Sequence, residues 1–443
     1  MTERPLAAVI LAAGLGTRMR SETPKHLHPL LGRRLVDWVI EAGRALGPDP
    51  LVVVTSPDHA DVFEGVEVAI QAEPRGTGDA AAAARASLEG FQGSVLVLTG
   101  DCATITPGLL GDLLATHHSA RAASTVLSFE LDDPGAYGRI VRGVDGSLQA
   151  IVEARDASDA ELALHEVNSS IYVFEAEQLW PALERLRSNN DQGELYLTDT
   201  VRDLVREGEA VAVHMAPDSQ EVEGVNTRVE LAAAAAVLRD RINREHMLAG
   251  ATIVDPANTW IEPDVQLEPD CTIQPFTMLS GSTKVARGAS VGPHAVAVDT
   301  EIGEGALVGP FCYLRPGTVL GAGAKAGTFV EIKNSRIGER TKVPHLSYMG
   351  DADIGDDTNV AAGNITVNFS HEEGKAKGRT TIGDNVRTGV HNAFVAPVEI
   401  GDDAWIGAGS VITEDVPPES LAIARQRQVT KEGYVREKRE RDD

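Results

Sequence analysis

A six-residue spacing of apolar side chains constrains this chain more than any other feature of its sequence. Three runs keep the spacing: Ile261, Leu267, Ile273, Leu279, Val285 and Val291; Ile302, Val308, Leu314, Leu320, Ala326 and Ile332; Ile382, Thr388, Phe394, Ile400, Ile406 and Ile412. Neither a helix, with about 3.6 residues per turn, nor a strand, whose side chains alternate, produces this period. A three-faced prism does, because each face takes one hexapeptide and every sixth side chain points inward. We therefore predict a parallel β-helix over residues 250–443.

Such a solenoid has flat outer faces and no pocket of its own. Substrate sites are expected where neighbouring prisms pack against each other, and a three-faced prism packs naturally as a trimer. The last residues, 435–443, are a run of charges that we expect to be disordered.

The first half of the chain has a different pattern. Short aliphatic runs alternate with helical stretches, as in "AAVILAAG", "LVVVT", "SVLVLTGD", "STVLSFEL" and "SIYVFEA". This alternation predicts an α/β domain over residues 1–228 with a mostly parallel sheet, whose ligands bind beyond the carboxyl ends of the strands. Residues 229–249 contain no Gly or Pro and are followed by Gly250, which predicts one linker helix, Val229 to Leu248, about 30 Å long.

Charge and composition exclude several classes of protein. The formal net charge is -26, which argues against nucleic-acid binding because that needs a basic surface. Three cysteines without CxxC spacing fit a reducing compartment. No apolar run approaches the roughly 20 residues of a membrane span, and the N-terminus lacks the apolar core of a signal peptide. We predict a cytoplasmic protein with no membrane insertion.

Glycines and cations gather directly behind the first aliphatic run, in "LAAGLGTRMRSETPK". Gly14 and Gly16 allow a tight loop whose backbone N–H groups can approach a phosphate, and Arg18 and Lys25 add positive charge. Taken alone, the pattern fits a phosphate cradle or a plain strand-to-helix turn with surface cations.

The complete string is more specific. "LAAGLGTRM" followed by "PK" resembles the signature of sugar-1-phosphate nucleotidylyltransferases. Together with the helix and the hexapeptides, the chain resembles the bifunctional N-acetylglucosamine-1-phosphate uridylyltransferase / glucosamine-1-phosphate N-acetyltransferase family of bacterial cell-wall precursor synthesis. The resemblance implies a Rossmann-like α/β nucleotidylyltransferase domain, a linker helix and a left-handed parallel β-helix, assembled as a homotrimer. It also implies acetyl transfer from acetyl-CoA to glucosamine 1-phosphate, then uridylyl transfer from UTP to N-acetylglucosamine 1-phosphate.

The resemblance assigns one set of residues to the uridylyltransferase site. Asp101 and Asn226 match the pair that positions Mg²⁺, a metal that suits a sparse, oxygen-rich site. Gln71 could offer a donor and an acceptor to uracil. The nucleotide and sugar contacts that match are Leu11, Ala12, Ala13, Gly14, Arg18, Lys25, Gln71, Gly76, Thr77, Thr99, Gly100, Asp101, Gly138, Glu153, Asn168 and Asn226. Taken alone, Asp101 fits a strand-end turn and Asn226 a helix N-cap.

A second set matches the acetyltransferase site. His345 matches the catalytic base that takes a proton from the amino group of glucosamine 1-phosphate, a role that suits imidazole near neutral pH. Arg315, Lys333, Tyr348 and Asn359 match the contacts of the sugar phosphate. The acetyl-CoA contacts that match are Ala362, Asn368, Phe369, Val390, Ala408 and Arg425, with Phe369 where tyrosine and Val390 where serine is usual.

Two other hypotheses remain open at this point. The chain could be a single-function nucleotidylyltransferase whose β-helix only holds a trimer together, or a non-catalytic regulatory subunit. Lys25, Asp101 and Asn226 argue against the second, and Arg315, Lys333 and His345 argue against the first.

Overall fold

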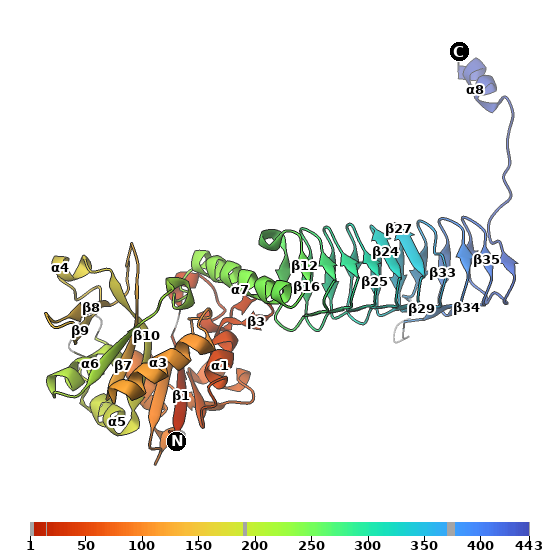
Figure 1. Cartoon of the computed structure of the whole chain (residues 1–443). Helices are drawn as coiled ribbons and strands as arrows, with labels where there is room; N and C mark the ends of the chain where they lie inside the picture. Colours follow the sequence, from red (N-terminus) through yellow and green to blue (C-terminus); the bar gives the residue numbers. More distant parts are fainter. Residues whose placement is uncertain (1–3, 15, 189–192, 370–376, 443) are drawn as a thin grey trace. The chain divides into compact units, whose positions relative to one another are not determined.

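The structure is a computed structural model that describes residues 4–14, 16–188, 193–369 and 377–442. It divides into two compact units, Met1–Leu238 and Arg239–Asp443, each with its own core (Figure 1). Within the described ranges, no helix combines the length and the apolar character that crossing a membrane requires.

A mixed nine-stranded sheet forms the core of the first unit, and its main strands run in the order β11-β7-β10-β6-β1-β4-β5. All five strand-like segments of the sequence are strands here. β1 pairs in parallel with β4 and β6, as predicted, whereas β10 runs antiparallel to β6 and β7. The strands are β1 (Leu6–Leu11), β4 (Leu51–Thr55), β5 (Glu67–Ile70), β6 (Ser94–Thr99), β7 (Ser124–Glu130), β8 (Arg139–Arg142), β9 (Leu148–Val152), β10 (Glu166–Glu175) and β11 (Val211–Met215), with a separate pair, β2 (Pro29–Leu30) and β3 (Arg33–Arg34).

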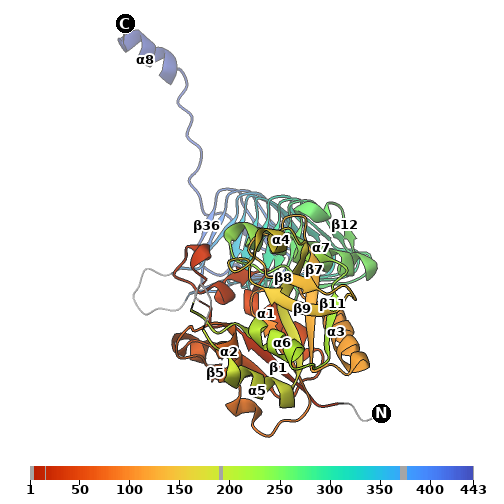
Figure 2. The ribbon, with the colours of Figure 1, turned by 90° about the vertical axis from the view of Figure 1, so that its left-hand side faces the viewer.

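Helices cover both faces of this sheet, which is why its central strands are apolar on both sides. One cluster of buried side chains joins α1 and α3 to the sheet, and another joins α2, α5 and α6 to the opposite face. These five helices are labelled around the sheet in Figure 2. The helices are α1 (Leu35–Arg44), α2 (Thr77–Ala83), α3 (Pro107–Ala120), α4 (Asp159–Leu162), α5 (Ala176–Arg185) and α6 (Leu197–Arg206).

The predicted long helix is α7 (Arg228–Leu248), confirmed to within one residue. A capping box starts it: Thr227 Oγ1 accepts from Glu230 N at 3.2 Å, and Glu230 Oε2 accepts from Thr227 N at 2.9 Å. Thr227 is therefore the capping residue, so the side chain of Asn226 is not needed to cap the helix.

The second unit is the predicted left-handed parallel β-helix, whose successive coils can be followed in Figure 1. The strands of the first face are β12 (Thr252–Ile253), β15 (Thr272–Ile273), β18 (Ser290–Val291), β21 (Leu307–Val308), β24 (Lys325–Thr328) and β27 (Lys342–His345), followed by β32 (Arg387–Thr388), β35 (Trp405–Ile406) and β37 (Leu421–Ala422). The strands of the second face are β13 (Trp260–Ile261), β16 (Met278–Ser280), β19 (Val296–Val298), β22 (Tyr313–Leu314), β25 (Glu331–Lys333), β28 (Tyr348–Gly350), β30 (Ile365–Val367), β33 (Ala393–Val395) and β36 (Val411–Ile412). The strands of the third face are β14 (Gln266–Leu267), β17 (Lys284–Val285), β20 (Glu301–Ile302), β23 (Val319–Leu320), β26 (Arg336–Ile337), β29 (Ala352–Ile354), β31 (Thr380–Ile382) and β34 (Val398–Ile400).

The side chains at the predicted six-residue positions form the core of this solenoid. All of them are buried except Leu267, which is half-buried on the first coil, where no earlier coil covers it. The run also continues where the sequence showed a break, because some corners take one residue fewer. Ala297 continues the first run, and the next buried position, Ile302, follows it by five residues, just as Ile337 follows Ile332. Lys284 accordingly pairs with Glu301 rather than with a residue 18 positions later.

The prediction of a disordered tail is wrong for most of its length. Tyr434–Asp442 forms helix α8, which contains strong helix formers and an Arg441–Glu437 ion pair at 3.8 Å, one turn apart.

Candidate active sites

A cavity of 540 Å³ lies at the carboxyl ends of the central strands in the first unit. That is where an open α/β sheet is expected to bind ligands. Most of the residues predicted for the uridylyltransferase site line it: Leu11, Ala12, Ala13, Gly14, Arg18, Lys25, Gln71, Gly76, Thr77, Thr99, Gly100, Asp101, Glu153 and Asn226. The structure therefore brings together residues that are more than two hundred positions apart in sequence.

Asp101 and Lys25 form the charged centre of this cavity. The Lys25 ammonium contacts Asp101 Oδ2, and Thr99 Oγ1 donates to Asp101 Oδ1 at 2.6 Å. Burial raises the pKa of the Asp101 carboxyl, but the charge and hydrogen bond of Lys25 and the bond from Thr99 outweigh it, so that the pKa lies below its usual value. The lowered pKa means that Asp101 is a carboxylate anion in the cavity.

Asn226 completes this centre. Its Oδ1 accepts from Lys25 Nζ at 3.0 Å and from Arg18 Nη2 at 2.8 Å. The segment before it is fixed to Asp101, because Val225 N donates to the Asp101 backbone oxygen at 2.9 Å. With Thr227 capping α7, the Asn226 amide oxygen faces the cavity.

The two glycines of the first loop have different tasks. A side chain at Gly16, whose φ is 61°, would overlap the Cβ of Lys25, so the glycine lets the loop pack against the lysine stem. A Cβ at Gly14 would meet no described atom within 4 Å, so this part of the loop stays open for a ligand. The sequence alone did not separate these tasks.

Gln71 marks another part of the cavity. Its Nε2 donates to the backbone oxygen of Gly76 at 3.1 Å and to Asp79 Oδ2 at 2.9 Å. Both amide hydrogens are therefore used inside the protein, and the remaining polar group is the acceptor Oε1. This differs from the expectation that Gln71 offers a ligand both a donor and an acceptor.

Glu153 lies at the sugar end predicted for the cavity. Thr198 Oγ1 donates to Glu153 Oε1 at 3.1 Å, and burial raises the pKa of the Glu153 carboxyl. Gly138 and Asn168 do not line the cavity. They lie behind it: Asn168 N donates to Gly138 O at 2.9 Å, and Asn168 Nδ2 donates to the hydroxyl of Tyr172, a lining residue, at 2.7 Å.

Some lining residues escaped the sequence analysis. Tyr196 and Thr198 line the cavity beside Glu153, and His26 lines it beside Lys25. Burial, His59 and the charges of Lys25 and Arg34 lower the pKa of His26 to about 4. Tyr196 is the N-cap of the amphipathic helix α6, and Thr198 lies in its first turn. Their place at the start of a helix is the sequence feature that could have identified them.

The second predicted site lies on the second face of the solenoid. Glu331 pairs with Tyr313 on one side and with Tyr348 on the other, and Lys333 pairs with Gly350. Arg315 N donates to Ile332 O at 2.8 Å, which places Arg315 on the coil before Lys333. The side chains of Arg315, Lys333 and Tyr348 thus project from three successive coils of one face.

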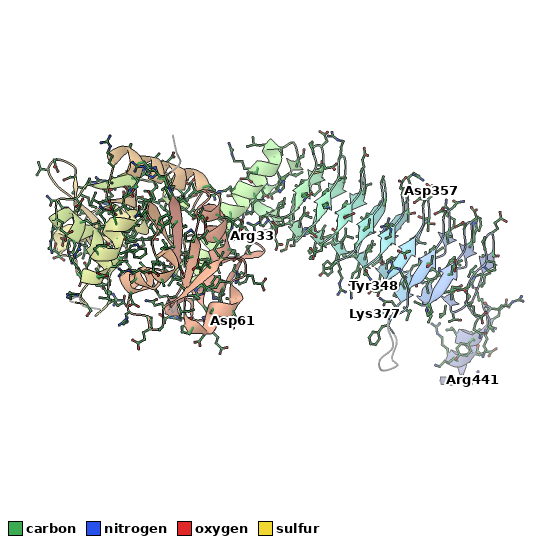
Figure 3. The ribbon with its side chains drawn as sticks, turned by 90° about the horizontal axis from the view of Figure 1, so that it is seen from below. Arg33, Asp61, Tyr348, Asp357, Lys377 and Arg441 are labelled. Carbon is green, nitrogen blue, oxygen red and sulfur yellow. The ribbon has the colours of Figure 1, made fainter. Side chains whose placement is uncertain are left out.

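A cation that the sequence analysis missed joins this group. The hydrogen bond and charge of Lys377, and then the charge of Arg315, lower the pKa of the Lys333 ammonium. Figure 3 shows Tyr348 and Lys377 on one side of the solenoid and Asp357 on the other. Glu331 Oε1 accepts a hydrogen bond from Arg315 Nη1 at 2.8 Å, which orients the Arg315 side chain. Three cations crowded on a strongly acidic protein point to an anion as their ligand.

His345 ends β27 at the corner next to this face. Two residues, Leu346 and Ser347, separate it from Tyr348, and its ring is exposed. Asn359 forms the bridge that joins β27 to β32, since it pairs with Lys342 before it and with Arg387 after it.

The residues predicted for acetyl-CoA divide into two groups. Ala362, Val390 and Ala408 follow one another along the prism: His391 N donates to Ala362 O, and Gly409 N to Val390 O, both at 2.9 Å. Arg425 comes next, with its Cδ 3.7 Å from a Cβ built on Gly409.

Asn368 lies apart from these residues. It is buried, and its Nδ2 donates to Asp351 Oδ2 close to Lys333. Phe369 follows it and is 64% exposed. The structure thus places Asn368 near the cations predicted to bind the sugar phosphate, although the sequence assigned it to acetyl-CoA.

A cavity with cations at the end of an α/β sheet, followed by a hexapeptide solenoid with a cationic face, indicates a transferase with two separate sites. Comparison with known proteins agrees: the MobA-like NTP transferase domain matches residues 8–211, and the hexapeptide repeat of succinyl-transferase matches residues 379–414. The Bifunctional protein GlmU of Streptomyces avermitilis is 47% identical, covering 98% of this chain and 95% of that protein. The Bifunctional protein GlmU of Mycobacterium tuberculosis is 46% identical, covering 98% of this chain and 92% of that protein.

The chain therefore belongs to the family of bifunctional GlmU proteins. Membership confirms the predicted family, the predicted fold class and a bifunctional enzyme with nucleotidyltransferase and acetyltransferase activity.

Proposed function

We propose that the cavity of the first unit, within residues 1–228, joins UTP to N-acetylglucosamine 1-phosphate and releases pyrophosphate. The convergence of Lys25, Asp101 and Asn226 supports this best, because a triphosphate needs cations and a place for a metal. The Gly14 loop leaves room for the nucleotide, and Gln71 Oε1 accepts from the uracil imide N–H. Glu153 accepts hydrogen bonds from the sugar hydroxyls.

The donor set of this cavity fits Mg²⁺. The described residues contain no group of three or more His, Cys, Asp or Glu side chains placed to hold a metal ion. A metal in this cavity would therefore have two protein ligands, the Asp101 carboxylate and the Asn226 amide oxygen. Mg²⁺ suits such a sparse set, since it keeps several waters and binds substrate phosphates. When bound, the metal would neutralise charge on the phosphates during transfer.

We propose that the second unit, within residues 250–443, transfers the acetyl group of acetyl-CoA to glucosamine 1-phosphate, and that residues 229–249 link the two functions. Arg315, Lys333 and Lys377 hold the phosphate, and Tyr348 and Asn359 contact the sugar. His345 takes a proton from the amino nitrogen as that nitrogen attacks the thioester carbon, and CoA leaves as the thiol. Ala362, Val390, Ala408 and Arg425 lie along the edge where the cofactor would bind, whereas Asn368, followed by Phe369, lies closer to the cations that hold the phosphate.

Two separate assays test this assignment on the purified full chain. One follows pyrophosphate from UTP and N-acetylglucosamine 1-phosphate with Mg²⁺, and the other follows free thiol from acetyl-CoA and glucosamine 1-phosphate. Both activities are expected. Pyrophosphate release alone would favour a single-function nucleotidylyltransferase, and the absence of both would favour a regulatory subunit.

Lys377 provides a sharper test of the phosphate site. Lys377→Ala is expected to raise the KM for glucosamine 1-phosphate about tenfold with little change in kcat, because it removes a charge that binds the phosphate equally before and during the reaction. Lys284→Ala removes an exposed lysine from the third face and is the matched control. An unchanged KM in Lys377→Ala would remove this lysine from the site.

We also propose that the chain is a homotrimer assembled through its solenoid. A column of rings, Phe276, His294, Phe311 and Phe329, runs along one corner, with centroids 4.8, 4.8 and 5.3 Å apart. The three phenylalanines are about half exposed, between 48% and 58%. An exposed apolar column of this kind is typical of a surface that another subunit covers.

Phe311→Asp is expected to convert the trimer to monomers, measured by light scattering after gel filtration, because it places a charge in the middle of this column. Gln266→Asp adds the same charge on a strand of the third face and should leave the mass unchanged. A Phe311→Asp protein of wild-type mass would place the interface elsewhere.

We place both reactions in the cytoplasm, where UTP and acetyl-CoA are made. Cys102, Cys271 and Cys312 are all buried and unpaired, as expected for a reducing compartment.

A further inference from the structure

Lys25 contacts the same two oxygens that the proposed function gives to the metal. Its ammonium touches Asp101 Oδ2 and donates to Asn226 Oδ1 at 3.0 Å. The Lys25 and Asp101 side chains are only 16% and 17% exposed, so water does little to separate their charges. In this state the lysine is the counter-ion of the carboxylate.

The ammonium and a divalent cation cannot both occupy this position. Mg²⁺ holds oxygen ligands at about 2.0–2.1 Å, so an ion shared by both oxygens would overlap the ammonium nitrogen. Two positive charges at contact distance also repel strongly where water is excluded. Lys25 must therefore leave Asp101 before these oxygens can bind a metal.

The structure provides for this movement. Gly16 packs against the Cβ of Lys25 and fixes the base of the side chain, while the flexible four-carbon stem leaves the ammonium free to turn. No described atom lies within 4 Å of a Cβ built on Gly14, and a phosphate bound there would offer the ammonium a new anionic partner. The lysine can thus exchange a carboxylate for a phosphate without a change in the backbone.

We propose that Lys25 is a stand-in cation: it fills the metal position while the cavity is empty and releases that position only when a nucleoside triphosphate draws it away. This inference rests on the proposed function, which assigns the metal to Asp101 and Asn226. As a consequence, metal binds weakly to the protein alone, and metal and nucleotide strengthen each other's binding. Thermodynamic linkage requires this coupling to be the same in both directions.

The test measures Mn²⁺ binding to the full chain without nucleotide, by the loss of the free-ion signal in electron paramagnetic resonance. Mn²⁺ is a probe for Mg²⁺ because both prefer oxygen ligands, and added Mg²⁺ should displace it. Lys25→Gln is expected to bind Mn²⁺ at least about tenfold more tightly than the wild type, within the usual range of coupling between sites. Lys25→Met, unbranched and uncharged, is the second variant in case the glutamine destabilises the fold, and it should show the same gain.

Arg18→Gln is the matched control. It also removes a cation that bonds to Asn226 Oδ1, at 2.8 Å, but Asp101 is not among the partners of Arg18 in the described ranges. It should change Mn²⁺ affinity by less than about threefold, because its guanidinium contacts the neutral Asn226 amide and not the Asp101 carboxylate whose charge attracts the metal. Equal gains in Arg18→Gln and the Lys25 variants would mean that only the net charge of the cavity matters, which overturns the stand-in role.

Asp101→Asn separates the failure of this inference from the failure of the proposed function. If it weakens Mn²⁺ binding while the Lys25 variants bind no more tightly than the wild type, the metal site stands and the stand-in role is wrong. If it leaves Mn²⁺ binding unchanged, the metal assignment itself is wrong, and the inference falls with it.

Discussion

Asp101→Asn is expected to lower kcat for pyrophosphate release by about 10²–10³-fold, the usual effect of removing one group that stabilises charge in a transition state. The change removes the negative charge that would hold the metal. It keeps the size of the side chain and an oxygen that can accept from Thr99, now at 2.6 Å from Asp101 Oδ1. Thiol release by the second unit should stay at the wild-type rate. Both rates are measured on the same purified protein.

Glu41→Gln is the control for the loss of a carboxylate in the first unit. Glu41 pairs with Arg44 at 2.7 Å on the surface of α1, and 50% of its side chain is exposed. Both activities of this variant should match the wild type, and the melting temperatures of the two variants show whether either is unfolded. An Asp101→Asn protein that keeps pyrophosphate release within a few-fold of the wild type would show that the carboxylate is not a metal ligand.

The solenoid could be predicted closely from the sequence because its core depends on a local rule. Each coil needs one inward-pointing apolar side chain on each face, so the spacing of apolar residues alone identified buried residues such as Ile273 and Phe394. The strict period of six missed the corners that take one residue fewer. Ile337 is five residues after Ile332, yet both are buried, because the coil closes with a shorter turn.

The active sites were less predictable because they depend on contacts that are distant in sequence. The ends of β1 and β6 meet because these strands pair, so the proximity of Leu11 and Thr99 follows from the parallel sheet. Nothing in the local pattern around Asn226 shows that its side chain reaches Lys25, and only the resemblance to a family pointed to it. Lys377 was missed because it lies between strands, outside the hexapeptide pattern.

The antiparallel course of β10 was missed for a similar reason. An alternation of strands and helices predicts parallel neighbours, but β8 and β9 form a hairpin before β10, and only the one-turn helix α4 lies between the hairpin and that strand. A hairpin reverses the chain without a crossover helix, and the next strand can then enter the sheet in the opposite direction. Nothing in the sequence "SIYVFEA" indicates whether this strand runs parallel or antiparallel to its neighbours in the sheet.

His345→Ala is expected to lower kcat for thiol release by about 10²–10⁴-fold, the contribution usual for a general base. The amino group of glucosamine 1-phosphate must lose a proton as it attacks, and His345 supplies the imidazole of the turn from β27 to β28, where the other residues are Leu346 and Ser347. The change removes an exposed ring, so the solenoid core remains intact. Pyrophosphate release from the same molecule should be unchanged and is the internal control.

Added imidazole distinguishes a base from a structural residue. Because the His345 ring is exposed, its removal leaves a space that a small base can enter from solution. Thiol release by His345→Ala should therefore recover in part as imidazole is added, measured at constant pH and ionic strength. Tyr348→Phe, which removes a proposed sugar contact and leaves the base in place, should not respond to imidazole. Equal losses of both activities in His345→Ala, or a loss that imidazole does not relieve, would show that His345 supports the fold or the sugar and takes no proton.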